Sequence, residues 1–252
     1  MDWAYLAFEV RSEHLQQALR SLVALGVQGI NLTIPHKEVA VGMVDELAPS
    51  ARFLGAVNTV QVKDDRLIGH NTDASGFLRS LAEADVSLTG ASAVLVGAGG
   101  AARAIAFALA QAGVTHLTIT NRTPDKAFTL AKQIEQHHPA LAVAARALGD
   151  AGLRKAVVDA ALVVNATSVG MPPQEAAAPL AEEWLQPGQL VVDIIYRPAQ
   201  TRLLQAAERR GCRTLNGVKM LVWQGAEAFA LWTGTPAPVA VMERALLQAL
   251  VE

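Results

Sequence analysis

Glycine and alanine fill the segment Gly97-Ala98-Gly99-Gly100-Ala101-Ala102, which lies between a predicted strand (residues 93–96) and a predicted helix (residues 101–112). The spacing matches G-x-G-x-x-A, a pattern that binds dinucleotides in this strand-turn-helix context. The first glycine permits a tight turn, the second lets a pyrophosphate approach the backbone, and a small third residue allows close helix packing, while the helix N-terminus attracts phosphate. The alternative is an ordinary strand-to-helix turn, but such turns rarely need three glycines.

Asn121-Arg122-Thr123 follows the next predicted strand, about 24 residues beyond Gly97, and Lys126 comes shortly after it. Enzymes that use NAD place an acidic residue here to bind the ribose 2′-hydroxyl. This chain offers a guanidinium, a hydroxyl and an ammonium instead, which suit the 2′-phosphate of NADP. The alternative is that Arg122 and Lys126 are solvated cations at a helix start, where positive charge opposes the helix dipole. The sequence therefore favours NADP over NAD.

A hydroxyl and an ammonium follow another predicted strand in Asn31-Leu32-Thr33-Ile34-Pro35-His36-Lys37. Ligands bind at the C-terminal ends of strands in open α/β sheets, and a lysine there can donate a proton to a carbonyl oxygen that is becoming an alkoxide. Asn58 and Asp73 add an amide and a carboxylate from the same half of the chain. Taken alone, Lys37 is better explained as a solvated lysine after a proline.

The elements that must position these residues alternate along the chain. Short β-branched segments are followed by longer Ala- and Leu-rich segments, which predicts β-α-β units and an α/β fold with a largely parallel sheet. Lys63-Asp64-Asp65 predicts a hairpin turn. Strands are expected at residues 5–10, 29–34, 57–62, 66–69, 93–96, 117–120, 162–165 and 190–194, and helices at residues 13–25, 75–84, 101–112, 123–136, 153–159, 203–210, 219–233 and 239–250.

Composition excludes several classes of protein. With 21 basic and 23 acidic residues the net charge is -2, so no basic field is available for nucleic acid or an anionic membrane. No stretch of about 18 uncharged apolar residues could span a bilayer, and the first residues lack the charge of a signal peptide, which predicts a cytoplasmic protein. The single Cys212 allows no internal disulfide, and the histidines have no metal-ligand spacing, so no metal is expected.

Seven ordered segments together resemble the shikimate dehydrogenase family, and the resemblance covers nearly the whole chain. They are Asn31-Leu32-Thr33-Ile34-Pro35-His36-Lys37, Gly55-Ala56-Val57-Asn58-Thr59, Asn71-Thr72-Asp73, residues 97–101, Asn121-Arg122-Thr123, Asn165-Ala166-Thr167-Ser168-Val169-Gly170-Met171, and Asn216-Gly217 with Met220-Leu221-Val222-Trp223-Gln224. The resemblance implies an NADP-dependent oxidoreductase of the shikimate pathway, which reversibly reduces 3-dehydroshikimate to shikimate in aromatic amino-acid biosynthesis.

The resemblance also implies roles for single residues. Lys37 would give and take the proton, and Asp73 would orient the ammonium beside it. The implied substrate-binding residues are Thr33, Lys37, Asn58, Asp73, Tyr196 and Gln224, with core packing as the alternative for Tyr196 and Gln224. Together, the motifs and the resemblance give a cofactor set of Gly97, Ala98, Gly99, Gly100, Ala101, Asn121, Arg122, Thr123, Lys126, Thr167, Ile194 and Gly217, of which Ile194 and Gly217 would border the nicotinamide.

The family's architecture implies two domains with a cleft between them, whose closure would exclude water from hydride transfer. Residues 1–73 and 217–252 are expected to form a smaller α/β substrate domain, residues 74–88 a linker helix, and residues 89–216 a Rossmann-type NADP domain with a parallel sheet. The expected partners are small molecules, shikimate and 3-dehydroshikimate. The chain itself is expected to be a monomer or a homodimer.

The chain departs from the family's pattern at its start. Members begin with a strand, a Gly-x-Pro turn and a Ser-x-Ser motif that holds the substrate carboxylate, whereas this chain opens at a segment, residues 3–8, that resembles the family's second strand. On the order of 30 residues are therefore expected to be absent. Two alternative functions stay open because of this departure: a non-catalytic NADP-binding module, and a dehydrogenase with an altered substrate such as quinate.

Overall fold

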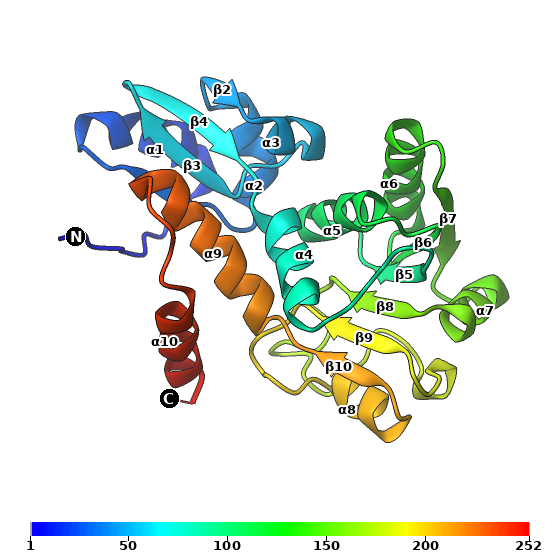
Figure 1. Cartoon of the computed structure of the whole chain (residues 1–252). Helices are drawn as coiled ribbons and strands as arrows, with labels where there is room; N and C mark the ends of the chain where they lie inside the picture. Colours follow the sequence, from blue (N-terminus) through cyan, green and yellow to red (C-terminus); the bar gives the residue numbers. More distant parts are fainter. Residues whose placement is uncertain (1, 252) are drawn as a thin grey trace. The chain divides into compact units, whose positions relative to one another are not determined.

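The structure is a computed structural model that describes residues 2–251. Contacts between Cα atoms divide the chain into two compact units. The first unit runs to Thr72 and includes Ala230–Gly234, and the second comprises Asp73–Phe229 and the residues from Thr235 onward. Both units combine a sheet with helices, which confirms the predicted α/β class (Figure 1).

The first unit holds a four-stranded mixed sheet in the order β1-β3-β4-β2. Strands β1 (Gly29–Asn31), β3 (Thr59–Lys63) and β4 (Arg66–His70) are antiparallel, and β2 (Glu46–Leu47) runs parallel to β4. Its helical segments are η1 (Ser12–His14), α1 (Leu15–Ala24), α2 (His36–Val39), η2 (Ala40–Gly42) and α3 (Pro49–Leu54). Leu15 and Leu19 of α1 are four residues apart and therefore share the face that is buried with Val60 and Leu67 of the sheet.

The predicted hairpin at Asp64 and Asp65 is confirmed. Both residues adopt left-handed backbone conformations, with φ angles of 49° and 57°, and β3 pairs with β4 directly across them. Two successive left-handed residues give the turn whose twist matches that of paired strands.

The predicted strand over residues 5–10 is wrong, because residues 2–11 form no regular strand. Tyr5 and Phe8 are 70% and 77% exposed, and no strand among the described residues pairs with this segment. The residue types of this segment favour a strand, but a strand forms only where a neighbouring strand can satisfy its backbone hydrogen bonds. Local contacts hold the segment instead: the Tyr5 hydroxyl donates to Asn31 Oδ1 at 2.9 Å, and the Tyr5 ring stacks on Trp232.

The second unit contains a six-stranded, fully parallel sheet in the order β10-β9-β8-β5-β6-β7. Numbered from β5, this is the 3-2-1-4-5-6 order of the Rossmann fold. The strands are β5 (Ser92–Val96), β6 (His116–Asn121), β7 (Ala142–Ala147), β8 (Leu162–Asn165), β9 (Leu190–Asp193) and β10 (Arg213–Leu215). Central strands β8 and β9 are buried along their whole length, which explains their continuous Leu-Val-Val sequences.

The helices of the second unit precede this sheet, join its successive strands or follow it. They are α4 (Asp73–Glu83), α5 (Gly100–Gln111), α6 (Pro124–His137), α7 (Ala151–Asp159), η3 (Glu182–Trp184), α8 (Arg202–Arg209), α9 (Val218–Thr233, of which the part from Ala230 belongs to the first unit) and α10 (Val239–Val251). The division by contacts therefore groups α4, most of α9 and α10 with the Rossmann sheet. The boundaries of the substrate domain and the NADP domain given above describe ligand binding and stay a prediction.

Close packing between α4 and α9 explains this grouping. A Cβ on Gly76 of α4 would lie 2.8 Å from the Gln224 backbone nitrogen of α9, so the helices touch through glycine. Glu83 accepts hydrogen bonds from Lys219 and from the Trp223 indole at 2.9 Å each, and these bonds hold the pKa of Glu83 below its usual value.

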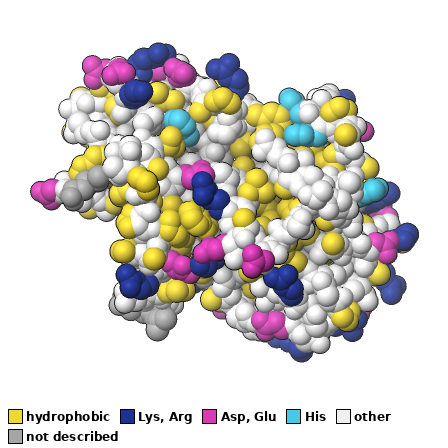
Figure 2. All heavy atoms as spheres, in the orientation of Figure 1, with side chains coloured by type: hydrophobic (Ala, Val, Ile, Leu, Met, Phe, Trp, Pro, Cys, Tyr) yellow, Lys and Arg dark blue, Asp and Glu magenta, His cyan; other side chains and the backbone are white. Residues whose placement is uncertain are grey.

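Acidic and basic side chains are intermixed on the face of the molecule that Figure 2 shows. Surface ion pairs such as Arg20 with Asp45 and Arg209 with Glu182 follow the same pattern. No helix in the described part of the chain is long and apolar enough to cross a membrane.

Candidate active site

The glycine turn after β5 adopts a conformation that needs glycine at its first position. Gly97 has a φ of +125°, and its N–H donates to the Thr120 carbonyl at the end of β6 at 2.8 Å. A Cβ on Gly97 would lie 2.7 Å from the carbonyl oxygen of Ala166, in the loop after β8. Both the backbone angle and the neighbouring loop therefore exclude a side chain here.

This turn lies where the strand order of the parallel sheet reverses. The chain proceeds from β5 to β6 and β7 on one side and then returns to β8 on the other side of β5. In such sheets the crevice outside the C-terminal ends of the two strands at the reversal binds the ligand. The Gly97 turn and the Asn165-Ala166-Thr167 loop are the segments that follow these two strands.

The residues at this reversal fit a dinucleotide. Gly99 is exposed, and no described heavy atom beyond its chain neighbours lies within 4 Å of the position that a Cβ would take. Gly99 is also the N-cap of the 12-residue helix α5, and no side chain there bonds the first N–H groups. An open backbone at a helix N-terminus is the environment that a pyrophosphate requires. Ala98, Gly100 and Ala101 complete the predicted turn in the same segment.

The predicted 2′-phosphate residues lie where β6 leads into α6, from the last residue of the strand to the first turn of the helix. Asn121 ends β6 and donates from Nδ2 to the Thr123 carbonyl at 3.0 Å, which folds the segment into a compact turn. Arg122, Thr123 and Lys126 are all exposed, and the Thr123 side chain makes no capping hydrogen bond to α6. Two cations and a hydroxyl therefore face solvent next to the glycine turn.

Three further predicted cofactor residues lie in the loops after β8 and β9. Thr167 donates from its backbone N–H and its hydroxyl to Asn165 Oδ1, at 3.1 and 2.7 Å. The backbone of Gly217 lies against Ile194: a Cβ on Gly217 would lie 1.9 Å from the Ile194 carbonyl oxygen, and the Gly217 N–H donates to the Ile195 carbonyl at 2.9 Å. The structure thus brings Gly97, Thr167, Ile194 and Gly217 to one edge of the sheet.

In the first unit the structure brings together the segments that carry Thr33, Lys37 and Asn58. The Leu32 N–H donates to the Asn58 carbonyl at 2.8 Å, and the Val57 N–H donates to the Lys37 carbonyl at 2.7 Å. Thr33 is exposed and Lys37 is half-buried, whereas Asn58 is 1% exposed. Lys37 belongs to the first unit and Asp73 begins the second, so their predicted pairing stays a prediction.

A buried polar network surrounds Asn58. Asn58 Nδ2 donates to the Thr72 hydroxyl at 3.0 Å, and Asn58 Oδ1 accepts from the Thr72 N–H at 2.9 Å and from the Thr59 hydroxyl at 3.0 Å. Asn31 extends the network by donating to Thr59 Oγ1 at 3.0 Å. These bonds fix the backbone directly before Asp73, which begins α4 and is 4% exposed.

Tyr196 and Gln224, the two remaining predicted substrate residues, differ in their surroundings. Tyr196 is 38% exposed on the loop after β9, so it is not a core residue. Gln224 is half-buried on α9 and donates from Nε2 to the Leu221 carbonyl at 3.1 Å. The substrate contacts of both side chains stay predictions.

Asp193, at the end of β9, also lies at this edge of the sheet, but it was not predicted from the sequence as a site residue. It is fully buried, and it accepts hydrogen bonds from Asn165, Ile195 and Thr201. The sequence does contain a sign of it, because Leu-Val-Val-Asn and Leu-Val-Val-Asp both end in a polar residue, and parallel strands present such ends at the same edge.

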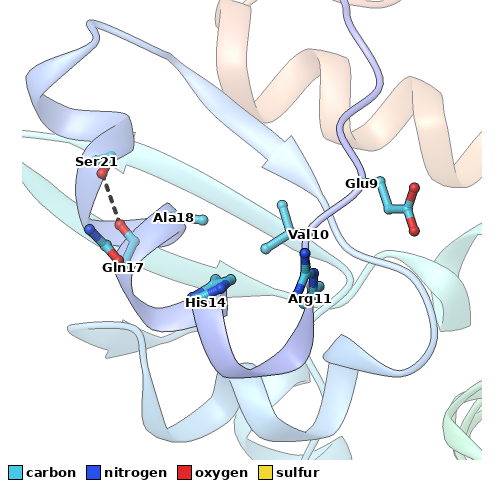
Figure 3. Close-up of a pocket in the computed structure, with 7 residues that line it drawn as sticks. All are labelled: Glu9, Val10, Arg11, His14, Gln17, Ala18 and Ser21. Atoms are coloured by element: carbon cyan, nitrogen blue, oxygen red, sulfur yellow. Dashed lines mark hydrogen bonds between the residues drawn. The ribbon is translucent and has the colours of Figure 1, made fainter.

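A hollow in the first unit lies apart from the predicted site residues. It is lined by Glu9, Val10 and Arg11 of the segment before η1, by His14 of η1, and by Gln17, Ala18 and Ser21 of α1 (Figure 3). The Val10 carbonyl bonds His36 Nε2 at 2.8 Å, so this histidine, which precedes Lys37, anchors the chain beside the hollow. Among residues 2–251, no group of three or more His, Cys, Asp or Glu side chains could hold a metal ion.

Comparison with known proteins identifies the family. Residues 1–60 match the model of the shikimate dehydrogenase substrate binding domain, residues 80–194 match shikimate / quinate 5-dehydrogenase, and residues 217–247 match the shikimate 5'-dehydrogenase C-terminal domain. A shikimate dehydrogenase (NADP(+)) from Moorella thermoacetica is 51% identical over 98% of this chain and 83% of its own length.

Solved structures agree with the sequence matches. Shikimate 5-dehydrogenase from Thermus thermophilus, in complex with NADP(H) and shikimate, superposes with a TM-score of 0.86 at 40% identity, over 96% of this chain and 86% of that one. Quinate dehydrogenase from Corynebacterium glutamicum, in complex with NAD, gives a TM-score of 0.86 at 36% identity, over 93% and 82% of the two chains. The family and the fold class predicted from the sequence are confirmed, and the chain belongs to the shikimate dehydrogenase family.

Proposed function

We propose that this chain catalyses the reversible, NADP-dependent interconversion of shikimate and 3-dehydroshikimate. The observation that carries the proposal is the 51% identity, over 98% of the chain, to an NADP-dependent shikimate dehydrogenase. The enzyme class and the cofactor predicted from the sequence are confirmed by this relationship.

The residues around the glycine turn would hold NADP(H). The open backbone at Gly99 and the start of α5 receive the pyrophosphate, because free N–H groups and the helix dipole favour negative charge there. Arg122, Thr123 and Lys126 bind the 2′-phosphate, since a planar guanidinium can donate two parallel hydrogen bonds to phosphate oxygens. Thr167, Ile194 and Gly217 border the nicotinamide end. When bound, NADPH supplies a hydride.

Lys37 carries the proton of the reaction. Its ammonium donates a proton to the substrate carbonyl oxygen as hydride reaches the carbonyl carbon, so the product is a neutral alcohol. In the reverse direction the Lys37 amine takes the proton from the hydroxyl. Asp73 binds the same hydroxyl and orients the Lys37 ammonium toward it.

Thr33, Asn58, Tyr196 and Gln224 hold the other polar groups of the substrate. Thr33 and Tyr196 are exposed enough to bond a ligand directly. Asn58 acts mainly by fixing Thr72 and therefore the position of Asp73, because both polar atoms of its side chain bond the protein. Hydrogen bonds of this kind orient the ring carbonyl for hydride transfer.

A second candidate substrate is quinate. It is favoured by the match to quinate dehydrogenase, whose TM-score equals that of the Thermus thermophilus shikimate enzyme. The two acids differ in the ring groups that a pocket must satisfy, so relative kcat/KM separates them. The cytoplasmic location and the monomeric or homodimeric state stay predictions.

Initial rates of nicotinamide reduction test the proposal. Purified chain is assayed with shikimate and with quinate, each with NADP and with NAD. The proposal expects the highest kcat/KM for shikimate with NADP. A higher kcat/KM for quinate would transfer the function to the second candidate, and NADP binding without turnover of either acid would show a non-catalytic binding module.

A further inference from the structure

A buried carboxylate lies at the C-terminal edge of the Rossmann sheet. Asp193 Oδ1 accepts from Asn165 Nδ2 and from the Ile195 N–H, both at 3.1 Å, and Asp193 Oδ2 accepts from the Thr201 hydroxyl at 2.8 Å. Burial raises the pKa of Asp193 against the effect of these three donors. Burial of a carboxylate costs free energy because the group loses its hydration. We therefore expect Asp193 to have a role other than packing.

One side of this carboxylate controls the loop after β8. Asn165, held through Nδ2 by Asp193, also donates from Nδ2 to the Val169 carbonyl at 3.2 Å. Its Oδ1 accepts both the N–H and the hydroxyl of Thr167. The position of Thr167 is therefore set by the orientation of one amide, and that amide is oriented by Asp193.

The other side controls the loop after β9. The Ile195 N–H bonded to Asp193 follows Ile194 directly, and Thr201 is the N-cap of α8, where its hydroxyl also accepts from the Leu204 N–H at 3.3 Å. The two loops pack on each other, because a Cβ on Gly170 would lie 3.3 Å from Ile195 Cδ1 and 3.4 Å from the Thr201 Cβ. One carboxylate thus bonds both loops.

We propose that Asp193 is a positioning residue for the cofactor: through Asn165 and Thr201 it sets the distance between Thr167 and Ile194, two of the residues assigned above to the nicotinamide end of the cofactor. This inference rests on the proposed function. Asp193 acts without touching the cofactor, and its contribution is to keep the two loops in the one arrangement that fits the bound dinucleotide.

The opposite edge of the same strand provides a matched control. Gln189, directly before β9, is 5% exposed, donates from Nε2 to the Val157 and Ala160 carbonyls at 2.6 and 2.8 Å, and accepts from the Gln186 N–H at 2.8 Å. Gln189 therefore resembles Asp193 in being buried and hydrogen-bonded through its side chain, but it lies at the N-terminal edge of the sheet, away from the glycine turn.

The test compares Asp193→Asn, Thr201→Val and Gln189→Leu with the wild-type chain, by NADP titration, steady-state kinetics and thermal unfolding. In Asp193→Asn, the new NH₂ group must point at one of the groups that now donate to the carboxylate. In Thr201→Val, the hydroxyl donor is lost and the carboxylate stays in place. Both variants should raise the Kd for NADP about tenfold, while the KM for shikimate stays within about twofold of wild type. Gln189→Leu should lower the unfolding temperature but bind NADP as the wild type does.

Either of two results would overturn this inference and leave the proposed function standing. One is wild-type NADP affinity in Thr201→Val and Asp193→Asn, and the other is a loss of affinity in Gln189→Leu equal to theirs at the same loss of thermal stability. If Asp193→Asn fails to fold, Thr201→Val decides by the same criteria. Absence of NADP binding by the wild-type chain is a different result, because it would overturn the proposed function itself.

Discussion

Asn58 bonds Thr72 through both polar atoms of its side chain: the Thr72 N–H donates to Asn58 Oδ1 at 2.9 Å, and Asn58 Nδ2 donates to the Thr72 hydroxyl at 3.0 Å. Both residues are buried. This pair fixes the backbone at the point where the sheet of the first unit ends and α4 begins with Asp73.

Replacement of Asn58 by alanine should destabilise the fold. The buried N–H of Thr72 loses its acceptor, and a buried unsatisfied donor costs about 1–3 kcal/mol. The free energy of unfolding in urea should fall by about that amount, and kcat should fall because Asp73 is less well held. Gln28→Ala is the control, since Gln28 is exposed and its side chain bonds only the nearby Gly26 carbonyl among the hydrogen bonds described. Equal stability of the two variants would contradict this account.

Alanine at Gly99 and at Gly97 should separate cofactor binding from folding. The Gly99 Cβ position is open and its φ is −86°, so Gly99→Ala should keep the wild-type unfolding temperature but weaken NADP binding by about tenfold, because the methyl group occupies the approach of the pyrophosphate. Gly97→Ala should lower the unfolding temperature as well, because of its positive φ and the Ala166 carbonyl. Thermal unfolding with NADP titration checks both, and unchanged affinity in Gly99→Ala would place the pyrophosphate elsewhere.

Arg122 should decide between the two nicotinamide coenzymes. A charged hydrogen bond contributes about 1.5–3 kcal/mol, so Arg122→Ala should raise the Kd for NADP by roughly 10- to 100-fold and leave the Kd for NAD nearly unchanged. Lys132→Ala, at an exposed lysine further along α6, is the matched control. If Arg122→Ala weakens both coenzymes equally, Arg122 does not bind the 2′-phosphate.

Asp45 should make stability depend on pH in the acid range. The Leu67 N–H donates to Oδ2 at 2.8 Å and Arg20 donates to Oδ1 at 2.6 Å, and these bonds lower the pKa of Asp45 in the folded chain. An acid whose pKa is lower when folded stabilises the fold above its unfolded pKa of about 3.9, and this contribution is lost as the pH falls through the folded value. The difference in free energy of unfolding between wild type and Asp45→Asn should therefore shrink below about pH 4. A difference independent of pH would show that ionisation of Asp45 is not involved.

The parts of the fold that were predictable from the sequence are those with strong local patterns. Strands β5, β8 and β9 are short apolar segments buried on both faces, and the glycine turn after β5 has its spacing in the chain itself. Strand β7 (Ala142–Ala147) was missed because alanine has low strand propensity, and only its register with β6 makes it a strand. Strand β10 was missed because three residues are too few to show a period.

The candidate site was predictable to the same extent. Motif spacing placed the predicted cofactor residues at or near the ends of strands of the Rossmann unit, and their contacts with the cofactor stay a prediction. The carboxylate of Asp193 could not be assigned from spacing, since its partners Asn165 and Thr201 lie 28 and 8 residues away and meet it only through the parallel register of β8 and β9. Tertiary pairing supplies that information.

The most direct test of the account compares wild type and Lys37→Ala in the rate at which NADP is reduced while shikimate is oxidised. The Kd for NADP is measured for both chains. Lys63→Ala, an exposed lysine at the end of β3, is the control. General acid–base catalysis contributes about 10²- to 10⁴-fold, so Lys37→Ala should lose that much in kcat while its Kd for NADP matches wild type. Turnover by Lys37→Ala at the wild-type rate would contradict the assignment of the proton to Lys37.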